Sequence, residues 1–176
     1  MLLRALRFVM GAAVAFAIWW YATPAYDDLL CELLQQFGVH AVAVDRIVRV
    51  ARIGAPDIQV PADQLTYNFV LFIALAAAVP TRKVWRLLVA LIVLLAIHPF
   101  ALAVTIETTW ATRAGPWSAA HYSSLEQQFW TSIDFLYRLG GMFGIAFVCW
   151  YSATYGAREP QPGTAKKSPR GGRARR

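Results

Sequence analysis

Charged residues are scarce in this sequence. Only 15% of its 176 residues are Asp, Glu, Lys or Arg. By contrast, 58% are hydrophobic and 14% aromatic, and the mean hydropathy is +0.44. A soluble domain of this size needs a larger polar surface, so the composition excludes an ordinary soluble protein and indicates an integral membrane protein.

Residues that bind metals or form disulfides are also few. The chain has two cysteines and three histidines, without a CxxC pair or a cluster at metal-ligand spacing, so we expect no metal site and no cofactor. A disulfide needs Cα atoms within about 7 Å. Cys31 and Cys149 lie on opposite sides of the membrane in the topology predicted below, so they are not expected to pair.

Long apolar runs are what the sequence does contain. A hydrocarbon core about 30 Å thick takes roughly 20 helical residues to cross. Four runs approach that length, although the second is short, and they predict an all-α membrane protein with four transmembrane helices. The expected spans are residues 8–22, 65–79, 84–106 and 130–155.

The placement of charge predicts the orientation of these spans. Cytoplasmic loops collect Lys and Arg. Twelve of the 17 basic residues fall before residue 8, at residues 82–86 or after residue 155, whereas eight of the ten acids fall at residues 23–64 and 107–128. The pattern favours a topology with both termini in the cytoplasm.

The first apolar run has two interpretations. It is short, preceded by arginines and followed by small residues, as in a cleaved signal sequence. An uncleaved anchor is favoured, because Trp19, Trp20 and Tyr21 form the aromatic belt of a retained span. Pro24 is then expected to mark the end of this helix.

The outer segment, residues 23–64, is predicted to contain a short helix and a β-hairpin. The apolar residues of 26–37 share one helical face, so this helix is expected to lie along the membrane surface. Residues 42–60 are rich in β-branched side chains around a "GAPD" turn, which is typical of a hairpin. About forty residues are too few for a rich core. We therefore expect the segment to lean on the spans or on a partner.

The final segment, residues 156–176, is rich in Pro, Gly, Lys and Arg, and it contains no apolar residue larger than Ala. Such a composition predicts a disordered cytoplasmic tail. Its seven basic groups are expected to contact anionic lipid, and nucleic-acid binding is not needed to explain them.

His98 and Pro99 stand together inside the third apolar run. Pro99 is expected to kink the helix and to free the carbonyl of residue 95. A histidine at this depth should face protein or water rather than lipid. A buried, hydrogen-bonded side chain beside the kink is the favoured interpretation of His98.

A polar stripe precedes the last apolar run. Gln127, Thr131, Asp134 and Arg138 recur at helical spacing, so they share one face. Asp134 and Arg138, one turn apart, are interpreted as an interfacial or structural pair, as a contact with a partner, or as catalytic groups, in falling order of preference. Below them Gly140 and Gly144 form a GxxxG pattern suited to close helix packing.

Residues 61–107, "PADQLTYNFVLFIALAAAVPTRKVWRLLVALIVLLAIHPFALAVTIE", resemble the exosortase H-associated membrane proteins. The shared features are a Tyr near the start of a span, a Pro-plus-basic inner turn and a Leu-rich span that ends in Pro and Phe. The resemblance implies an accessory to an exosortase, a membrane transpeptidase that uses Cys, Arg and His. The Ser-Gly that follows the exosortase cysteine is absent after Cys31 and Cys149, so no catalytic residue is carried over.

Three functional hypotheses follow. The first is a non-enzymatic membrane subunit whose hairpin, polar stripe and glycines contact an envelope-protein sorting enzyme or its substrate. The alternative is a small intramembrane enzyme or transport unit, which requires His98, Asp134 and Arg138 to line one aqueous cavity. The third is a lipid-binding scaffold that depends on the basic tail.

Overall fold

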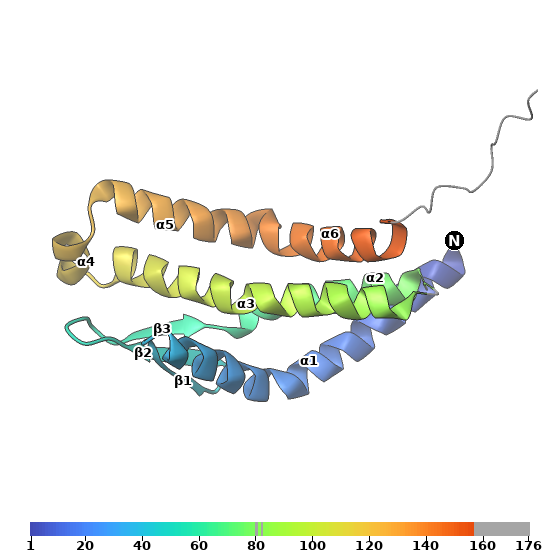
Figure 1. Cartoon of the computed structure of the whole chain (residues 1–176), viewed down its shortest axis with the longest axis horizontal. Coiled ribbons are helices and arrows are strands. Elements are labelled where there is room, and N and C mark those ends of the chain that lie inside the picture. The colour runs from blue at the N-terminus through green and yellow to red at the C-terminus, as the bar shows by residue number, and fades with distance from the viewer. Residues whose placement is uncertain (80, 82, 157–176) are drawn as a thin grey trace, which may run out of the picture.

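The computed structural model describes residues 1–79, 81 and 83–156 (Figure 1). The predicted tail therefore lies, apart from Gly156, outside the described residues. Helices dominate, with a small sheet after the first of them. The elements are α1 (Leu2–Gln36), β1 (His40–Val44), β2 (Ile47–Ala51), β3 (Ile58–Pro61), the 3₁₀ turn η1 (Asp63–Thr66), α2 (Asn68–Ala78), α3 (Val84–Arg113), α4 (Pro116–His121), α5 (Ser124–Leu136), the π-turn η2 (Tyr137–Gly141) and α6 (Met142–Tyr155).

Three helices in the described part of the chain are long and apolar enough to cross a membrane: α1, α3 and the continuous helix Ser124–Tyr155. The second predicted span, residues 65–79, is shorter. Its 11-residue helix α2 measures about 17 Å at 1.5 Å per residue, roughly half of a hydrocarbon core. The structure thus gives three full-length candidate spans and one half-length apolar helix.

Helix α1 differs from the prediction. The span and the surface helix expected after it form one helix of 35 residues, with Pro24 inside it. A proline removes the hydrogen bond to the carbonyl four residues earlier. Here that carbonyl belongs to Trp20, and it accepts a bond of 3.2 Å from Arg46 Nη2 of the β1–β2 turn. Because the lost bond is replaced, Pro24 bends α1 instead of ending it (Figure 1).

The predicted hairpin is part of a three-stranded antiparallel sheet with strand order β1-β2-β3. The "GAPD" turn joins β2 and β3 as expected. A second, tight turn at Asp45 and Arg46 divides the earlier β-branched stretch, and both residues adopt positive φ, 48° and 67°. Two positive φ angles match the twist of a two-residue hairpin. This turn was missed because its sequence lacks the usual Asn-Gly or Asp-Gly signal.

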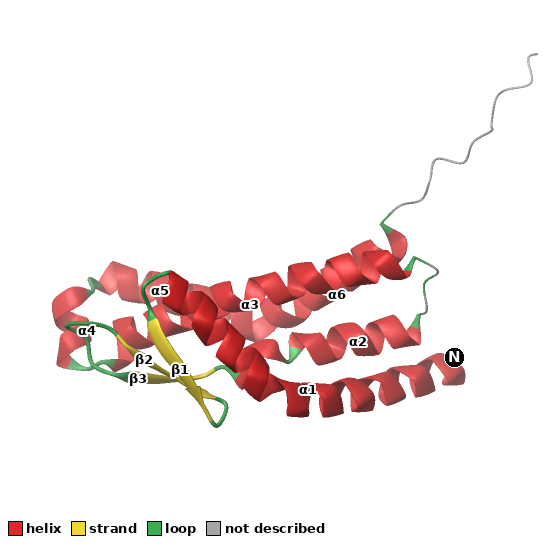
Figure 2. Cartoon of the chain, turned by 60° about the horizontal axis from the view of Figure 1, so that its bottom comes forward, coloured by secondary structure: helices red, strands yellow, loops and turns green. Residues whose placement is uncertain are grey.

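The sheet buries one face against the helices (Figure 2). Alternate strand residues such as Val48, Val50 and Val60 are at most 1% exposed. They pack with the second half of α1 and with the end of α3, where Trp110 is fully buried. The expectation that the outer segment would lean on the spans is confirmed.

A smaller core joins α2, α3 and α6 at the other end of the molecule. Its buried members are Phe72, Leu94, Ala146 and Trp150. Helix α1 lies against α2, and a Cβ added at Gly11 would meet Ala77 Cβ at 2.6 Å. The N-terminus and the last turn of α6 lie at this end of the molecule, whereas the sheet and α4 lie at the opposite end (Figure 1).

Candidate functional site

His98 sits at the centre of a buried polar network. Its side chain is 1% exposed, and its Nε2 lies 2.7 Å from Asn68 Oδ1 while its Nδ1 lies 2.8 Å from the Tyr26 hydroxyl. In the tautomer protonated on Nε2, the ring donates to Asn68 and accepts from Tyr26. The network therefore ties α3 to both α1 and α2, and the predicted buried, hydrogen-bonded His98 is found.

Pro99 lies inside α3 beside the same network. Proline frees the carbonyl of Leu95, as the sequence predicted. The Tyr26 hydroxyl also lies 3.2 Å from this oxygen, and its single proton goes either to this carbonyl or to His98 Nδ1. Both prolines inside the long helices thus leave a carbonyl within hydrogen-bond distance of a side chain from another element.

Irregular backbone between β3 and α2 lies beside this network. Ala62, Leu65 and Thr66 are all 2% exposed or less. Trp19 Nε1 donates to Thr66 Oγ1 at 2.7 Å, and the Tyr137 hydroxyl donates to the Leu65 carbonyl at 3.1 Å. Non-helical backbone is tolerated at membrane depth only where protein covers it. The half-length α2 and the segment before it satisfy this condition.

Asp134 and Arg138 form an ion pair along the last helix, with Arg138 Nε 2.8 Å from Asp134 Oδ2. Their side chains are 16% and 35% exposed. The other carboxylate oxygen of Asp134 accepts from Thr105 Oγ1 at 2.8 Å, and Arg138 Nη1 lies 3.5 Å from Gln64 Oε1. The pair therefore joins the last helix to α3 and to the segment before α2.

The upper half of the polar stripe behaves differently. Gln127 and Thr131 line an open groove of about 520 Å³ between α5 and the end of α3. Every residue that lines it carries a hydroxyl or an amide, and none carries a charge. They are Thr112, Ser124, Gln127, Gln128, Thr131 and Ser132.

The glycines that follow the stripe have two roles. Residues 137–141 form a short π-helical segment, in which a Cβ at Gly141 would lie 3.0 Å from the Leu136 carbonyl oxygen. A Cβ at Gly140 or Gly144 would meet no atom of the chain within 4 Å. The predicted GxxxG pattern therefore packs against nothing in the described structure.

The residues of the enzymatic alternative do not share a cavity. His98 lines a cavity of about 120 Å³ with residues of α1, η1 and α2. Asp134 lines another, of about 40 Å³, between α3 and the last helix. None of the cavities found among the described residues contains both side chains, so the geometry gives the alternative no support.

Neither cysteine belongs to a reactive cluster. Cys31 is buried in the outer core and Cys149 is half-buried on α6, and both are free thiols. In the described part of the chain, no group of three His, Cys, Asp or Glu side chains could hold a metal ion.

Several residues of these sites were not predicted from the sequence. Asn68 and Tyr26 were overlooked, although a polar residue within an apolar run is a signal of a buried hydrogen bond. Arg46 was counted only as a charge. The rule that located the free carbonyl of residue 95 would, applied to Pro24, have located the Trp20 carbonyl that Arg46 binds.

Comparison with known proteins identifies the family. The family model described as exosortase H-associated membrane protein matches residues 25–144, more than half of the chain. The chain belongs to this exosortase-associated membrane protein family. The match agrees with the resemblance seen in the sequence. No curated protein and no solved structure matches the chain.

The matched region contains most of the features described above. It begins at the bend of α1 and includes the sheet, Tyr26, Asn68, His98 and the polar stripe, and it ends at Gly144. The first turns of α1 and most of α6 lie outside it. The exosortase-associated family is thus matched over the sheet, the polar network and the whole of α2, α3, α4 and α5.

Proposed function

We propose that this protein is a non-enzymatic accessory subunit of the bacterial inner membrane that binds an exosortase-type sorting enzyme through its last helix. The observation that carries the proposal is the bare glycine surface of this helix in a chain of an exosortase-associated family. The partner supplies the chemistry, and this chain supplies a docking surface.

The glycine surface is suited to a helix of another protein. Small residues four apart let two helix backbones approach closely in a membrane. Gly11 already serves this purpose inside the chain, because it lies against Ala77. Gly140 and Gly144 have no such neighbour, and the large side chains around them, such as Leu139 and Phe143, are exposed. A transmembrane helix of the exosortase is the proposed occupant.

The uncharged groove at Gln127 and Thr131 is the proposed second contact. Hydroxyl and amide groups donate and accept hydrogen bonds without favouring either charge. They suit the main chain of an extended polypeptide, either a loop of the enzyme or the protein being sorted. Asp134 and Arg138 are assigned to holding the last helix against α3, since their hydrogen bonds are made within the chain.

The charge pattern and the shape support an orientation with both termini in the cytoplasm. The N-terminus and the last turn of α6 fall at one end of the molecule, and the sheet falls at the other (Figure 1). Helix α3 measures about 45 Å at 1.5 Å per residue, longer than the hydrocarbon core. Its last turns can therefore stand outside the membrane beside the sheet.

Co-purification in mild detergent tests the proposal. The tagged chain and an exosortase from the same cells are co-expressed, and recovery of the enzyme is measured for wild type, Gly140→Ile and Gly144→Ile. We expect both variants to lose most of the bound enzyme. They should fold normally, because a Cβ at either position would meet no atom of the chain within 4 Å.

Ala96→Ile is the matched control, because Ala96 is an exposed small residue of a different helix, α3. It should retain the enzyme. A wild-type chain that runs as a lone monomer with no enzyme would overturn the proposal. Loss of function after deletion of residues 158–176, with enzyme binding intact, would favour the lipid scaffold instead.

A further inference from the structure

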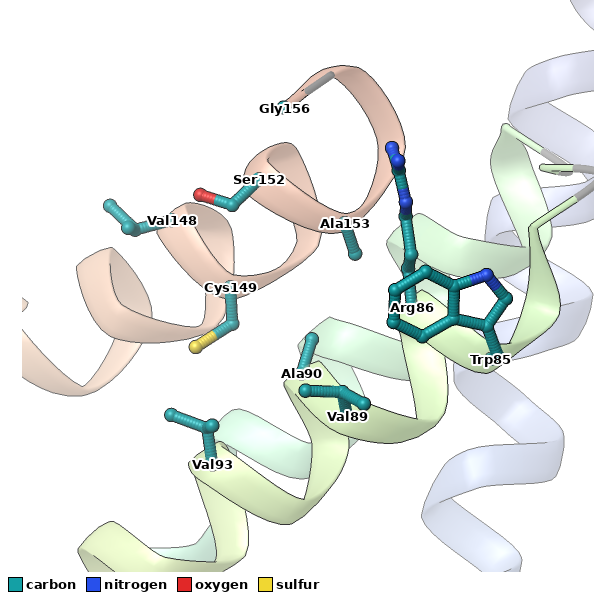
Figure 3. A pocket seen from close by; sticks show the side chains of 10 residues that line it. All are labelled: Trp85, Arg86, Val89, Ala90, Val93, Val148, Cys149, Ser152, Ala153 and Gly156. Atoms are coloured by element: carbon teal, nitrogen blue, oxygen red, sulfur yellow. The ribbon is translucent and has the colours of Figure 1, made fainter.

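We propose that the groove between the inner ends of α3 and α6 is a binding site for one anionic phospholipid (Figure 3). The groove has a volume of about 490 Å³, within the range of roughly 300–1,000 Å³ typical of small-molecule sites. Its walls are mainly apolar, formed by Val89, Ala90, Val93, Val148 and Ala153. It lies outside the glycine surface and does not depend on the proposed exosortase contact.

A cation stands at one end of this apolar groove. Arg86 extends from the first turn of α3 toward the last turn of α6, whereas Val93 and Cys149 face each other at the opposite end (Figure 3). Arg86 makes no ion pair with any described residue. No Asp or Glu occurs in residues 65–106 or 135–158, so neither wall of the groove carries an acid. The guanidinium is thus available to an anion from outside the chain.

Two further features of this end suit a phosphate group. The N-terminus of α3 has no side-chain cap, and the positive end of its dipole lies in the same first turn as Arg86. Trp85 lines the groove beside Arg86, with the guanidinium carbon 5.5 Å from its ring centroid. Tryptophan is enriched at the level of lipid headgroups. A lipid with its headgroup beside Arg86 and an acyl chain along the groove would contact both the cationic end and the apolar walls.

Other occupants fit less well. The segment after Gly156 carries seven basic residues and no apolar residue larger than Ala, so it would bring like charge to Arg86 and little to fill the apolar walls. An apolar partner helix would cover the walls but leave Arg86 without an anion. In the proposed orientation this end faces the cytoplasmic leaflet, whose anionic lipids attract basic groups.

Native mass spectrometry of the full chain released from detergent tests the site. Binding of phosphatidylglycerol is compared with that of phosphatidylcholine of the same acyl chains, and inorganic phosphate serves as a headgroup-only probe. We expect one tight phosphatidylglycerol, weaker phosphatidylcholine and no phosphate. Arg86→Gln should weaken the tight phosphatidylglycerol about fivefold. Ser152→Phe, at an exposed position of the wall, should block both lipids.

Arg7→Gln is the matched control, because it removes one arginine near the same end but away from the groove. It should leave the tight phosphatidylglycerol unchanged. Equal weakening by Arg7→Gln, or loss of binding only after deletion of residues 158–176, would overturn the site in favour of diffuse attraction to basic segments. If Arg86→Gln retained the lipid but had a lower Tm, the site would also be overturned. Arg86 would then stabilise the fold by contacting the last turn of α6.

Photolabelling locates the lipid independently of affinity. Phosphatidylglycerol with a diazirine on its acyl chain is irradiated in vesicles that contain the full chain, and labelled peptides are sequenced. Label within residues 85–93 and 148–156 that an excess of unlabelled phosphatidylglycerol removes is the expected result. Label spread evenly over all lipid-facing helices would show that the groove holds no particular lipid.

Discussion

The outer and inner halves of this molecule are packed in different ways. Among the described residues, the outer core contains thirteen buried hydrophobic side chains from the sheet, α1, η1 and α3. The inner core contains four, from α2, α3 and α6. Large apolar side chains such as Leu88, Ile92 and Val148 remain more than half exposed at the inner end.

The orientation proposed above, with the outer half in water and the inner half in hydrocarbon, accounts for the difference. In water, burial of apolar surface drives folding at roughly 25 cal/mol per Å². In hydrocarbon the same surface gains little from burial, because lipid tails are as apolar as leucine. The inner half therefore depends on close helix contacts such as Gly11 and on hydrogen bonds such as those of His98. The following predictions test this contrast, from the largest expected effect to the smallest.

Trp110→Ala should cause the largest loss of stability. Trp110 is fully buried in the outer core, and its Nε1 donates to the Pro56 carbonyl at 3.0 Å. Truncation of a buried aromatic residue costs about 3–5 kcal/mol. Thermal unfolding in detergent should show a much lower Tm, while Trp85→Ala, at an exposed inner position, should leave it within error. Equal effects of the two variants would contradict the contrast.

Gly11→Leu should destabilise by about 3 kcal/mol, the upper range for overpacking, because a Cβ there meets Ala77 Cβ at 2.6 Å. Gly144→Leu adds the same side chain at a position where a Cβ would meet no atom of the chain within 4 Å. It should keep the wild-type Tm and lose only the exosortase. A comparison of the two unfolding curves separates packing inside the chain from packing with a partner.

Asn68→Leu should cost about 2 kcal/mol, because it leaves His98 Nε2 buried without its partner. The double variant with His98→Leu should recover part of this loss, since two apolar groups replace a broken polar pair. Free energies of unfolding for the two single variants and the double variant measure this coupling. If the losses in free energy of unfolding were additive, Asn68 and His98 would not be energetically coupled.

Tyr122→Phe should have the smallest effect, about 1 kcal/mol, because it removes one hydrogen bond, of 2.7 Å, to Glu107 Oε2. Burial, followed by this bond, raises the pKa of Tyr122 from 10 to about 12. A raised pKa favours the protonated folded form, so its contribution is complete below pH 10 and is lost as the pH rises toward 12. The Tm difference between the two proteins should shrink over that interval and stay constant from pH 6 to 9.

The sequence predicted some elements of the fold because their signals are local. Apolar runs located the long helices, and the β-branched stretch with its "GAPD" turn located the last two strands. The end of α1 was predicted wrongly because a proline can bend a helix as well as end it, and here the freed Trp20 carbonyl accepts a hydrogen bond from Arg46. That donor, Arg46, lies in a turn 26 residues away, so no local rule could supply it.

The candidate sites show the same division. The helical spacing of Asp134 and Arg138 predicted that they could pair, and they do. Their contacts with Thr105 and Gln64 depend on how α5 meets α3 and η1, which spacing does not encode. The separation of His98 from Asp134 is likewise a property of helix packing.

Composition and charge order by themselves determined that this is a membrane protein, and the residues 61–107 were enough to suggest its family. These properties depend on how many apolar and charged groups occur, and in what order, which the chain carries whatever its conformation. Only the tertiary structure decided that Gly11 is packed against another helix while Gly140 and Gly144 are bare, and which half of the polar stripe remains open. Such differences depend on whether distant segments of the chain pack around a residue. The identity of the residue does not reveal this.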